Sequence, residues 1–138
     1  MRISVPRQMD SLSLLVAFVC DFLATEGLAD TSAFEIDLVL EELFTNLVRH
    51  GQSGRNAVDV SLTRSKDDLV LTLVEYDADF FDPTQAPEVD VDRPITERRA
   101  GGLGIHLVRV LSRDFQYDWQ DRLGTTTVTM RVSDPCST

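Results

Sequence analysis

Apolar residues recur every three or four positions in two stretches of the N-terminal half, which is the spacing of one face of an α-helix. The first stretch covers residues 9–28, and Gly27 suits its end because glycine adopts the left-handed conformation of a helix C-terminus without strain. The second begins near residues 30–32 and should stop at Gly51. Both patterns predict amphipathic helices that pack one face on a core.

Alternation of apolar and polar residues, typical of β-strands, replaces this spacing further along the chain. Residues 58–62 and 69–74 form two such runs, joined by a polar turn. Both sets of alternate positions in 69–74 are largely apolar, so this strand should be buried on both faces, or nearly so. Two further strands are predicted at about 115–120 and 126–132, and residues 2–5 could add a short edge strand.

Residues 77–100 show neither period and contain three prolines and many acids. A loop this long in a small domain is usually functional. A third helix is predicted to begin near residues 102–104. The order strand, helix, helix, strand, strand, loop, helix, strand, strand predicts an α+β two-layer sandwich. Its mixed, mostly antiparallel sheet should carry the helices on one face, in a single domain that spans residues 1–138.

Composition and charge narrow the function classes. A chain of 138 residues, 43% of them hydrophobic, suits one globular domain, and a net charge of -10 argues against nucleic-acid binding, which needs a basic face. No stretch is long and apolar enough for a signal peptide or a membrane span, so we expect a cytoplasmic protein with no membrane partner. Cys20 and Cys136 lack metal-type spacing, and Lys66, the one lysine, is not part of a P-loop.

Glu42, Asn46 and His50 are spaced by four residues in the second predicted helix and therefore lie on one face of it. An amide oxygen such as that of Asn46 suits a hard Mg²⁺ ion, and Glu42 could accept a proton from an attacking hydroxyl. The alternative is that these three residues form the solvated side of an amphipathic helix.

Glycines lead directly into the third predicted helix, in the string Gly101-Gly102-Leu103-Gly104. Glycine allows the backbone to approach a ligand closely, and a helix N-terminus offers free N–H groups and the positive end of a dipole. These features favour a phosphate site. A flexible loop that starts a helix without any ligand is the alternative.

Two further features could serve adenine recognition. Asp77 follows the central strand, where a carboxylate could accept a hydrogen bond from an exocyclic amine, although an Asp that starts a turn is common. Thr126 and Thr127 belong to a Gly-Thr-Thr-Thr string that opens the last strand. Threonine is an ordinary strand residue, so this string means little in isolation.

The order of these features resembles the Bergerat ATP-binding fold that gyrase and histidine kinases share. Within that superfamily, the chain is most similar to anti-sigma-factor serine kinases of the partner-switching type. The matching strings are Glu-Glu-Leu-Phe-Thr-Asn-Leu-Val-Arg-His-Gly at 41–51, Phe-Asp-Pro at 81–83, and Gly-Gly-Leu-Gly-Ile-His-Leu-Val-Arg at 101–109. The likeness spans nearly the whole chain.

The resemblance implies a role for each matching residue. Asn46 would coordinate the Mg²⁺ that bridges the phosphates, and Glu42 would be the general base for an incoming serine hydroxyl. The backbone of Gly102–Gly104, which includes Leu103, would bind the phosphates of ATP. Thr126 or Thr127 would support adenine recognition. The implied activity is phosphorylation of a serine on a STAS-domain anti-anti-sigma protein, combined with sequestration of a sigma factor or similar regulator, by a homodimer.

One departure from the family pattern concerns adenine. The family has an Asp two residues before a Gly at the end of the central strand, and alignment on residues 81–83 places Tyr76 and Ala78 at these positions. Asp77 is then one position off and on the other face, unless a local bulge restores it. The alternative function is therefore a catalytically degenerate binding module of the same fold. A histidine kinase catalytic domain and an unrelated enzyme that uses Glu42 and His50 are further alternatives.

Overall fold

The computed structural model describes residues 1–28, 30–50, 57–85 and 102–131, and it describes no side chains for 30–32, 50 and 102–104. Most of the predicted long loop and Cys136 therefore lie outside the described residues. The elements are β1 (Arg2–Pro6), η1 (Met9–Ser11), α1 (Leu12–Glu26), α2 (Asp30–His50), β2 (Ala57–Ser65), β3 (Asp68–Glu75), η2 (Pro83–Gln85), α3 (Gly102–Leu111), β4 (Asp114–Gln120) and β5 (Leu123–Arg131).

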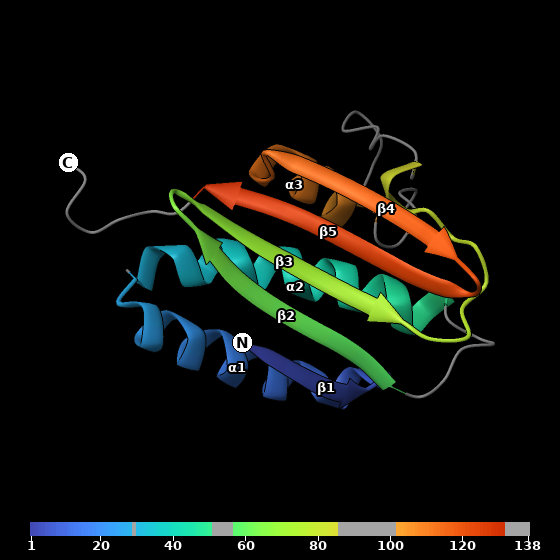
Figure 1. Ribbon diagram of the computed structural model, residues 1–138, viewed down its shortest axis with the longest axis horizontal. Helices are drawn as coiled ribbons and strands as arrows, with labels where there is room; N and C mark the ends of the chain where they lie inside the picture. The colour runs from blue at the N-terminus through green and yellow to red at the C-terminus, as the bar shows by residue number, and fades with distance from the viewer. Residues whose placement is uncertain (29, 51–56, 86–101, 132–138) are drawn as a thin grey trace.

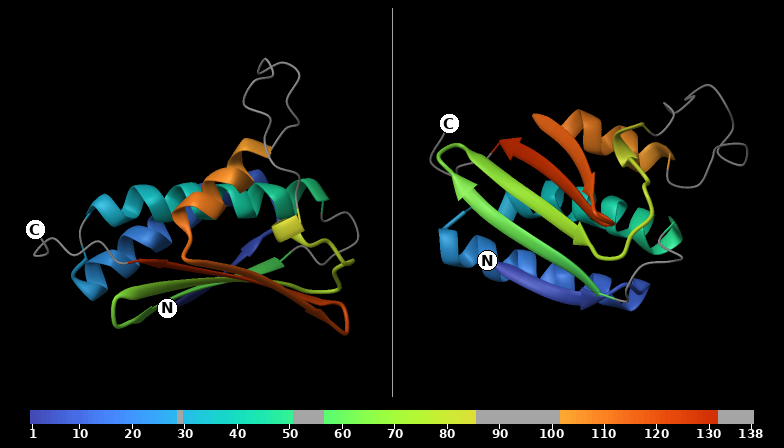
Figure 2. Two further views of the ribbon diagram at one scale, coloured as in Figure 1. Left: turned by 90° about the horizontal axis from the view of Figure 1, so that it is seen from above. Right: turned by 45° about the vertical axis from the view of Figure 1, so that its right-hand side comes forward.

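The described strands form one sheet in the order β1-β2-β3-β5-β4, and each neighbouring pair runs antiparallel. All three helices cover the same face of this sheet (Figures 1 and 2). The predicted α+β two-layer sandwich with helices on one face is thereby confirmed. We call the face of the sheet that the helices cover the inner face, and the opposite face the outer face.

The core lies between the helices and the inner face. Leu69, Leu71 and Leu73 of β3 are each 2% exposed or less, and Phe22 and Phe44 from the two long helices pack in the same cluster. Burial of one such side chain contributes about 1.5–3 kcal/mol of hydrophobic stabilisation.

The alternate residues of β3 that face outwards are half-buried, so the strand is fully buried on its inner face and only partly buried on its outer face. Its outer face carries Val70, Thr72 and Val74, and the described helices all lie on the other side. Because threonine and valine favour strands on any half-buried surface, the apolar content of β3 did not indicate a second covering layer.

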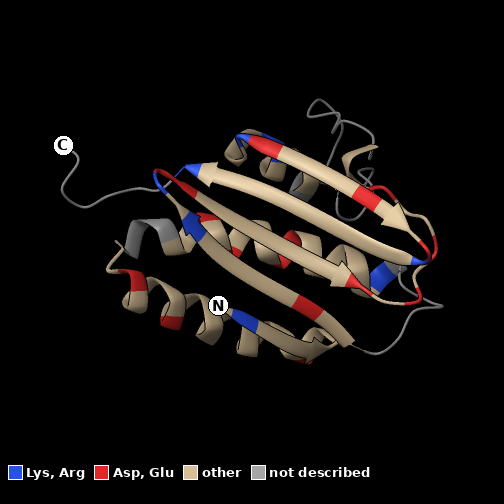
Figure 3. Cartoon of the chain, viewed as in Figure 1, with Lys and Arg blue, Asp and Glu red and all other residues tan. Residues whose placement is uncertain are grey.

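Helix α1 ends as the sequence predicts. Gly27 has a φ of 65° and its N–H donates to the carbonyl oxygens of Ala24 and Leu23. Helix α2 follows and runs along the inner face of the sheet (Figure 2). Among the described residues, acidic positions occur on both long helices and on strands and turns, whereas α1 has no basic residue and α2 has only Arg49 (Figure 3).

Candidate functional site

A buried carboxylate stands at the end of the central strand. The alternation that buries Leu71 and Leu73 continues to Glu75, which faces the helices and is 7% exposed. Oε1 of Glu75 lies 3.4 Å from Nη2 of Arg7, which is also buried. Burial raises the pKa of Glu75, and the charge of Arg7 opposes this increase. The inner face therefore carries an acidic side chain where the central strand ends.

The chain bulges directly after Glu75. Glu75 pairs with Gly124 in the β3–β5 ladder. The next contact between the two segments is a hydrogen bond of 2.8 Å from the N–H of Ala78 to the carbonyl of Arg122. Ala78 lies three residues after Glu75, but Arg122 lies only two residues before Gly124. The extra residue is accommodated where Asp77 adopts a φ of 51°. The bulge returns Ala78 to a buried position and leaves Asp77 exposed.

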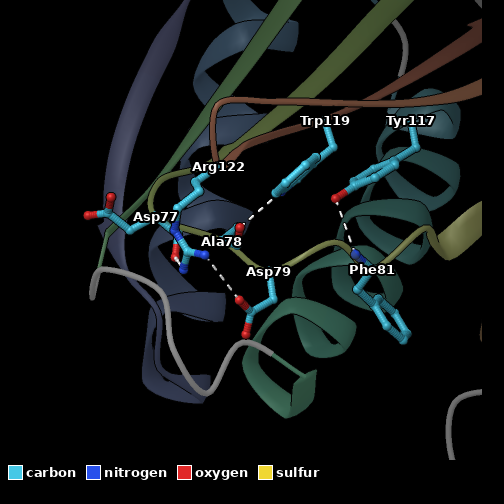
Figure 4. A network of polar contacts seen from close by, with 7 residues as sticks. All are labelled: Asp77, Ala78, Asp79, Phe81, Tyr117, Trp119 and Arg122. Atoms are coloured by element: carbon cyan, nitrogen blue, oxygen red, sulfur yellow. Dashed lines mark hydrogen bonds and ion pairs between the residues drawn. The ribbon is translucent and has the colours of Figure 1, made fainter.

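Asp77 does not occupy the position that we predicted for adenine recognition. Its side chain points away from Trp119 and Tyr117 (Figure 4). Its carbonyl oxygen accepts a hydrogen bond of 2.9 Å from Arg122. The inward-facing carboxylate at this end of the sheet belongs to Glu75.

Aromatic side chains of β4 hold the bulged segment against the sheet (Figure 4). Nε1 of Trp119 donates to the carbonyl of Ala78 at 2.9 Å, and the N–H of Phe81 donates to Oη of Tyr117 at 3.4 Å. The ring of Phe80 packs edge-on against Tyr117, with centroids 5.7 Å apart. This contact network fixes the backbone that follows Glu75.

The two predicted threonines lie on opposite faces of β5. Thr126 is 4% exposed and shares the inner face with Val128, whereas Thr127 is half-exposed on the outer face. Thr126 pairs with Tyr117, whose ring is half-buried on the same face. One pocket cannot take both threonine side chains, and only Thr126 shares a face with Glu75.

Tyr76 lies on the outer face, away from the helices. Its hydroxyl donates to Oδ2 of Asp59, which also accepts a hydrogen bond from Arg2. These hydrogen bonds, that of Tyr76 first, lower the pKa of Asp59, although burial opposes them. The residue that takes the place of the family Asp is thus part of a polar cluster on the opposite face from Glu75.

Glu42 and Asn46 lie one turn apart on α2. Asn46 is 8% exposed and Glu42 is half-buried. Burial raises the pKa of Glu42, the charge of Glu41 raises it further, and the charge of Arg49 lowers it. A raised pKa makes a carboxylate a stronger base near neutral pH, so the surroundings of Glu42 suit proton transfer. His50 ends α2, and its side chain is not described.

Helix α3 begins with the predicted glycine string, since its first residues are Gly102, Leu103 and Gly104. The start of α3, the end of α2, the end of β3 and the beginning of β5 lie towards the same end of the molecule (Figures 1 and 2). The predicted phosphate segment at the start of α3 is therefore towards the same end of the molecule as the end of β3, where Glu75 lies.

A family model described as a histidine kinase-like ATPase domain matches residues 5–132. The chain belongs to the histidine kinase-like ATPase domain family. The fold resembles that of the RsbU and RsbW domains of a Mycobacterium tuberculosis protein, with a TM-score of 0.65 and 15% identity over 98% of this chain. The chain spans 33% of that structure, about a third of its length.

Two histidine kinases share the fold with TM-scores of 0.52 and 0.51. AdeS of Acinetobacter baumannii is 18% identical, with 97% of this chain and 68% of that one covered. The histidine kinase domain of a blue-light activated kinase of Erythrobacter litoralis is 19% identical, with 92% and 61% covered. No match to this chain is found among curated proteins.

Membership of an ATPase domain family implies ATP as the ligand, and the donor atoms of the site fit a magnesium nucleotide. Asn46 offers a buried amide oxygen, which is a hard ligand of the kind that Mg²⁺ takes. Within the described residues, no group of three His, Cys, Asp or Glu side chains could hold a metal ion by itself. This donor set suits an ion held mainly by phosphates and water.

None of the described helices is long and apolar enough to cross a membrane.

Sequence reasoning missed Glu75 and Tyr117. The alternation of Leu69, Leu71 and Leu73 was the available signal, because its continuation by one step places Glu75 on the inner face. For Tyr117, the signal was the antiparallel pairing of β4 and β5, which sets it opposite Thr126. In this histidine kinase-like ATPase domain, both residues line the inner face where the central strand ends.

Proposed function

We propose that this chain binds ATP with Mg²⁺ between α2, α3 and the inner face of the sheet. We propose further that it transfers the γ-phosphoryl group to a serine of a STAS-domain anti-anti-sigma protein, and that it sequesters a sigma factor or similar regulator. The observation that carries the proposal is the pair Glu42 and Asn46, partly and fully buried on adjacent turns of α2. Asn46 lies one turn before the end of α2, and that end of the helix and the end of β3 lie towards the same end of the molecule.

In this proposal, adenine lies near the end of β3. The carboxylate of Glu75 accepts a hydrogen bond from the exocyclic amine, and the Thr126 hydroxyl supports it from the neighbouring strand. Gly124 lets the side chains of Glu75 and Tyr117 lie close to the backbone of β5, because a Cβ there would lie 3.5 Å from Oε2 of Glu75 and 3.1 Å from Oη of Tyr117. Glu75 therefore takes the part that sequence alignment assigned to position 76.

The phosphates lie at the start of α3, where the backbone N–H groups of Gly102–Gly104 and the helix dipole favour negative charge. Asn46 would hold the magnesium ion, which when bound neutralises charge on the phosphates. Glu42 accepts the proton of the attacking serine hydroxyl, and its raised pKa brings its basicity closer to neutral pH. Positioning and charge neutralisation supply most of the catalysis in such a transfer.

The test is incubation of the protein with labelled ATP, Mg²⁺ and the STAS-domain protein encoded beside it. We expect label on a partner serine, and a loss of at least about 100-fold in transfer rate for Glu42→Gln with nucleotide binding retained. Glu35→Gln, about two turns earlier on α2, is the matched control and should transfer at the wild-type rate. Wild-type transfer by Glu42→Gln would exclude Glu42 as the base.

One observation favours a second function, a binding module of the same fold without catalysis. The family Asp and Gly are replaced by Tyr76, which faces outwards, and Ala78. If Glu75 does not replace the Asp, nucleotide affinity is lost, and only sequestration of a partner remains. Calorimetric titration with ATP and Mg²⁺ separates the two functions, since the module should release no heat while it still binds its partner.

A further inference from the structure

A groove between α1 and α2 opens to solvent on the helical side of the molecule. Its floor is formed by Leu15 and Leu40, which are buried, and its rim includes the exposed residues Val16 and Glu41. The groove has a volume of about 190 Å³. Small-molecule sites usually occupy about 300–1,000 Å³, so this groove has the size of one or two side chains.

The wall that α2 contributes is acidic. Leu40 and Glu41 lie one turn after Asp37, and all three residues line the groove. Oδ1 of Asp37 is shielded from solvent and has no hydrogen-bond donor within the part of the chain that the structure describes. Burial, and to a lesser degree the charge of Glu41, raises the pKa of Asp37. A buried carboxylate oxygen of this kind is stabilised by a donor that carries positive charge.

The wall that α1 contributes is apolar on its exposed side as well as on its buried side. Leu14 and Val16 are 50% and 47% exposed, and Ala17 and Cys20 are exposed next to them. Ser13, which also lines the groove, and Asp21 are exposed polar residues of α1, so the apolar patch is limited to these four residues. The exposed side of α1 therefore has the character of a contact surface.

The excess of acidic residues on α1 and α2 indicates which kind of partner could bind in the groove. Helix α1 contains no lysine or arginine, and α2 contains only Arg49, near its far end, whereas acidic residues occur on both (Figure 3). A second copy of the chain docked symmetrically on this groove would bring Asp37 and Glu41 of both copies together. Because like charges at an interface cost several kcal/mol, the groove suits a partner of opposite charge.

We propose that the groove between α1 and α2 docks an amphipathic helical segment of a partner protein, which inserts one arginine or lysine between Asp37 and Glu41 and lays apolar side chains on the exposed side of α1. The proposal does not depend on the nucleotide site, which lies between the helices and the sheet. It gives the partner's contact segment a definite chemistry: a basic residue flanked by apolar residues at helical spacing.

Two synthetic helical peptides of Ala and Leu test the proposal, one with a central Arg and the other with Gln at that position. Binding to the full chain is measured by calorimetry, without nucleotide. We expect the Arg peptide to bind about tenfold or more tighter than the Gln peptide, as desolvated charge-assisted hydrogen bonds do. Absence of binding by the Arg peptide, or equal affinity of both, overturns the proposal.

Three variants locate the contact. Asp37→Asn keeps the shape of the side chain and should weaken the Arg peptide about tenfold, and Val16→Ser should weaken both peptides. Asp114→Asn, an exposed acid on β4, should leave both affinities unchanged. Thermal melting verifies that each variant is folded. Unchanged binding by Asp37→Asn overturns the proposal, as does a dimer in sedimentation that Val16→Ser dissociates, because the groove would then hold a second copy.

Discussion

Arg7 and Glu75 form an ion pair of 3.4 Å between Nη2 and Oε1, with 4% and 9% of the two side chains exposed. The pair joins the segment after β1 to the end of the central strand. Ion pairs in the interior seldom add net stability, because desolvation offsets their attraction. Removal of one partner, however, leaves a buried charge and costs several kcal/mol.

The first prediction concerns Glu75→Gln and pH. Burial raises the pKa of Glu75 in the folded protein above its unfolded value. The folded state therefore binds the proton more tightly, and the contribution of Glu75 to stability falls as pH rises from the unfolded pKa through the folded one. Glu75→Gln should remove this slope. Because the raised pKa means that the folded state disfavours the ionised carboxylate even beside Arg7, loss of this charge should leave the free energy of unfolding at pH 7 unchanged or slightly higher, unlike the removal of Arg7.

Urea denaturation from pH 4 to pH 8 measures both effects. Asp118→Asn, on the exposed outer side of β4, serves as the control and should keep the wild-type slope. If Glu75→Gln and the wild type showed parallel pH profiles, Glu75 would not titrate in this range.

The second prediction concerns Gly124. A Cβ at this position would lie 3.1 Å from Oη of Tyr117, closer than normal contact between heavy atoms. Gly124→Ala should therefore displace the Tyr117 hydroxyl, cost about 1–2 kcal/mol of stability and weaken nucleotide binding. At Gly27, a Cβ would meet nothing within 4 Å but φ is 65°, so Gly27→Ala should cost about 1 kcal/mol.

Chemical denaturation measures the stability of both variants, and ATP titration measures their nucleotide affinity. Together they distinguish the effect of packing at Gly124 from the effect of backbone strain at Gly27. Only Gly124→Ala should change nucleotide affinity. Equal nucleotide affinity of Gly124→Ala and the wild type would show that the space above Gly124 is not part of the site.

The helices and strands were predictable because each depends on local periodicity. The helix predicted from the apolar repeat in 9–28 and the strand predicted from the alternation around Leu71 are both present, with bounds within a few residues of those expected. The inward position of Glu75 was missed because alignment on residues 81–83 directed attention to positions 76–78, although the alternation of β3 already places Glu75 on the inner face. The bulge itself depends on hydrogen bonds from the β4–β5 hairpin, more than 40 residues away.

The groove between the two long helices was also beyond sequence reasoning. Helical spacing showed which residues of α1 face the core, but it could not show that Val16 stays exposed and lines a groove with Asp37. That relationship depends on the crossing of two helices, which periodicity in a single helix does not determine.

The third prediction concerns Asn46→Ala. Because the buried amide of Asn46 is the proposed protein ligand of Mg²⁺, its loss should abolish binding of ATP that depends on the ion. Calorimetric titration with ATP, with and without Mg²⁺, measures the effect. Thr45→Ser, its buried neighbour on α2, should titrate as the wild type does. Unchanged heats for Asn46→Ala would refute the assignment.

The last prediction decides which residue recognises adenine. Tyr76 faces outwards and donates a hydrogen bond to Asp59, so Tyr76→Phe should leave ATP affinity unchanged and cost about 1 kcal/mol of stability. Glu75→Gln should instead weaken ATP binding about tenfold or more, because its amide cannot match a carboxylate as acceptor. Both affinities are measured by calorimetry at pH 7.

The stability of Tyr76→Phe at low pH provides a check on the hydrogen bond between Tyr76 and Asp59. The lowered pKa of Asp59 contributes stability above its unfolded pKa, and this contribution is lost as pH falls through the folded one. The hydrogen bond of Tyr76 is the largest cause, so Tyr76→Phe should lose less stability between pH 5 and pH 2 than the wild type does. If Tyr76→Phe lost ATP binding while Glu75→Gln kept it, adenine would be recognised from position 76 and the inward carboxylate would be structural only.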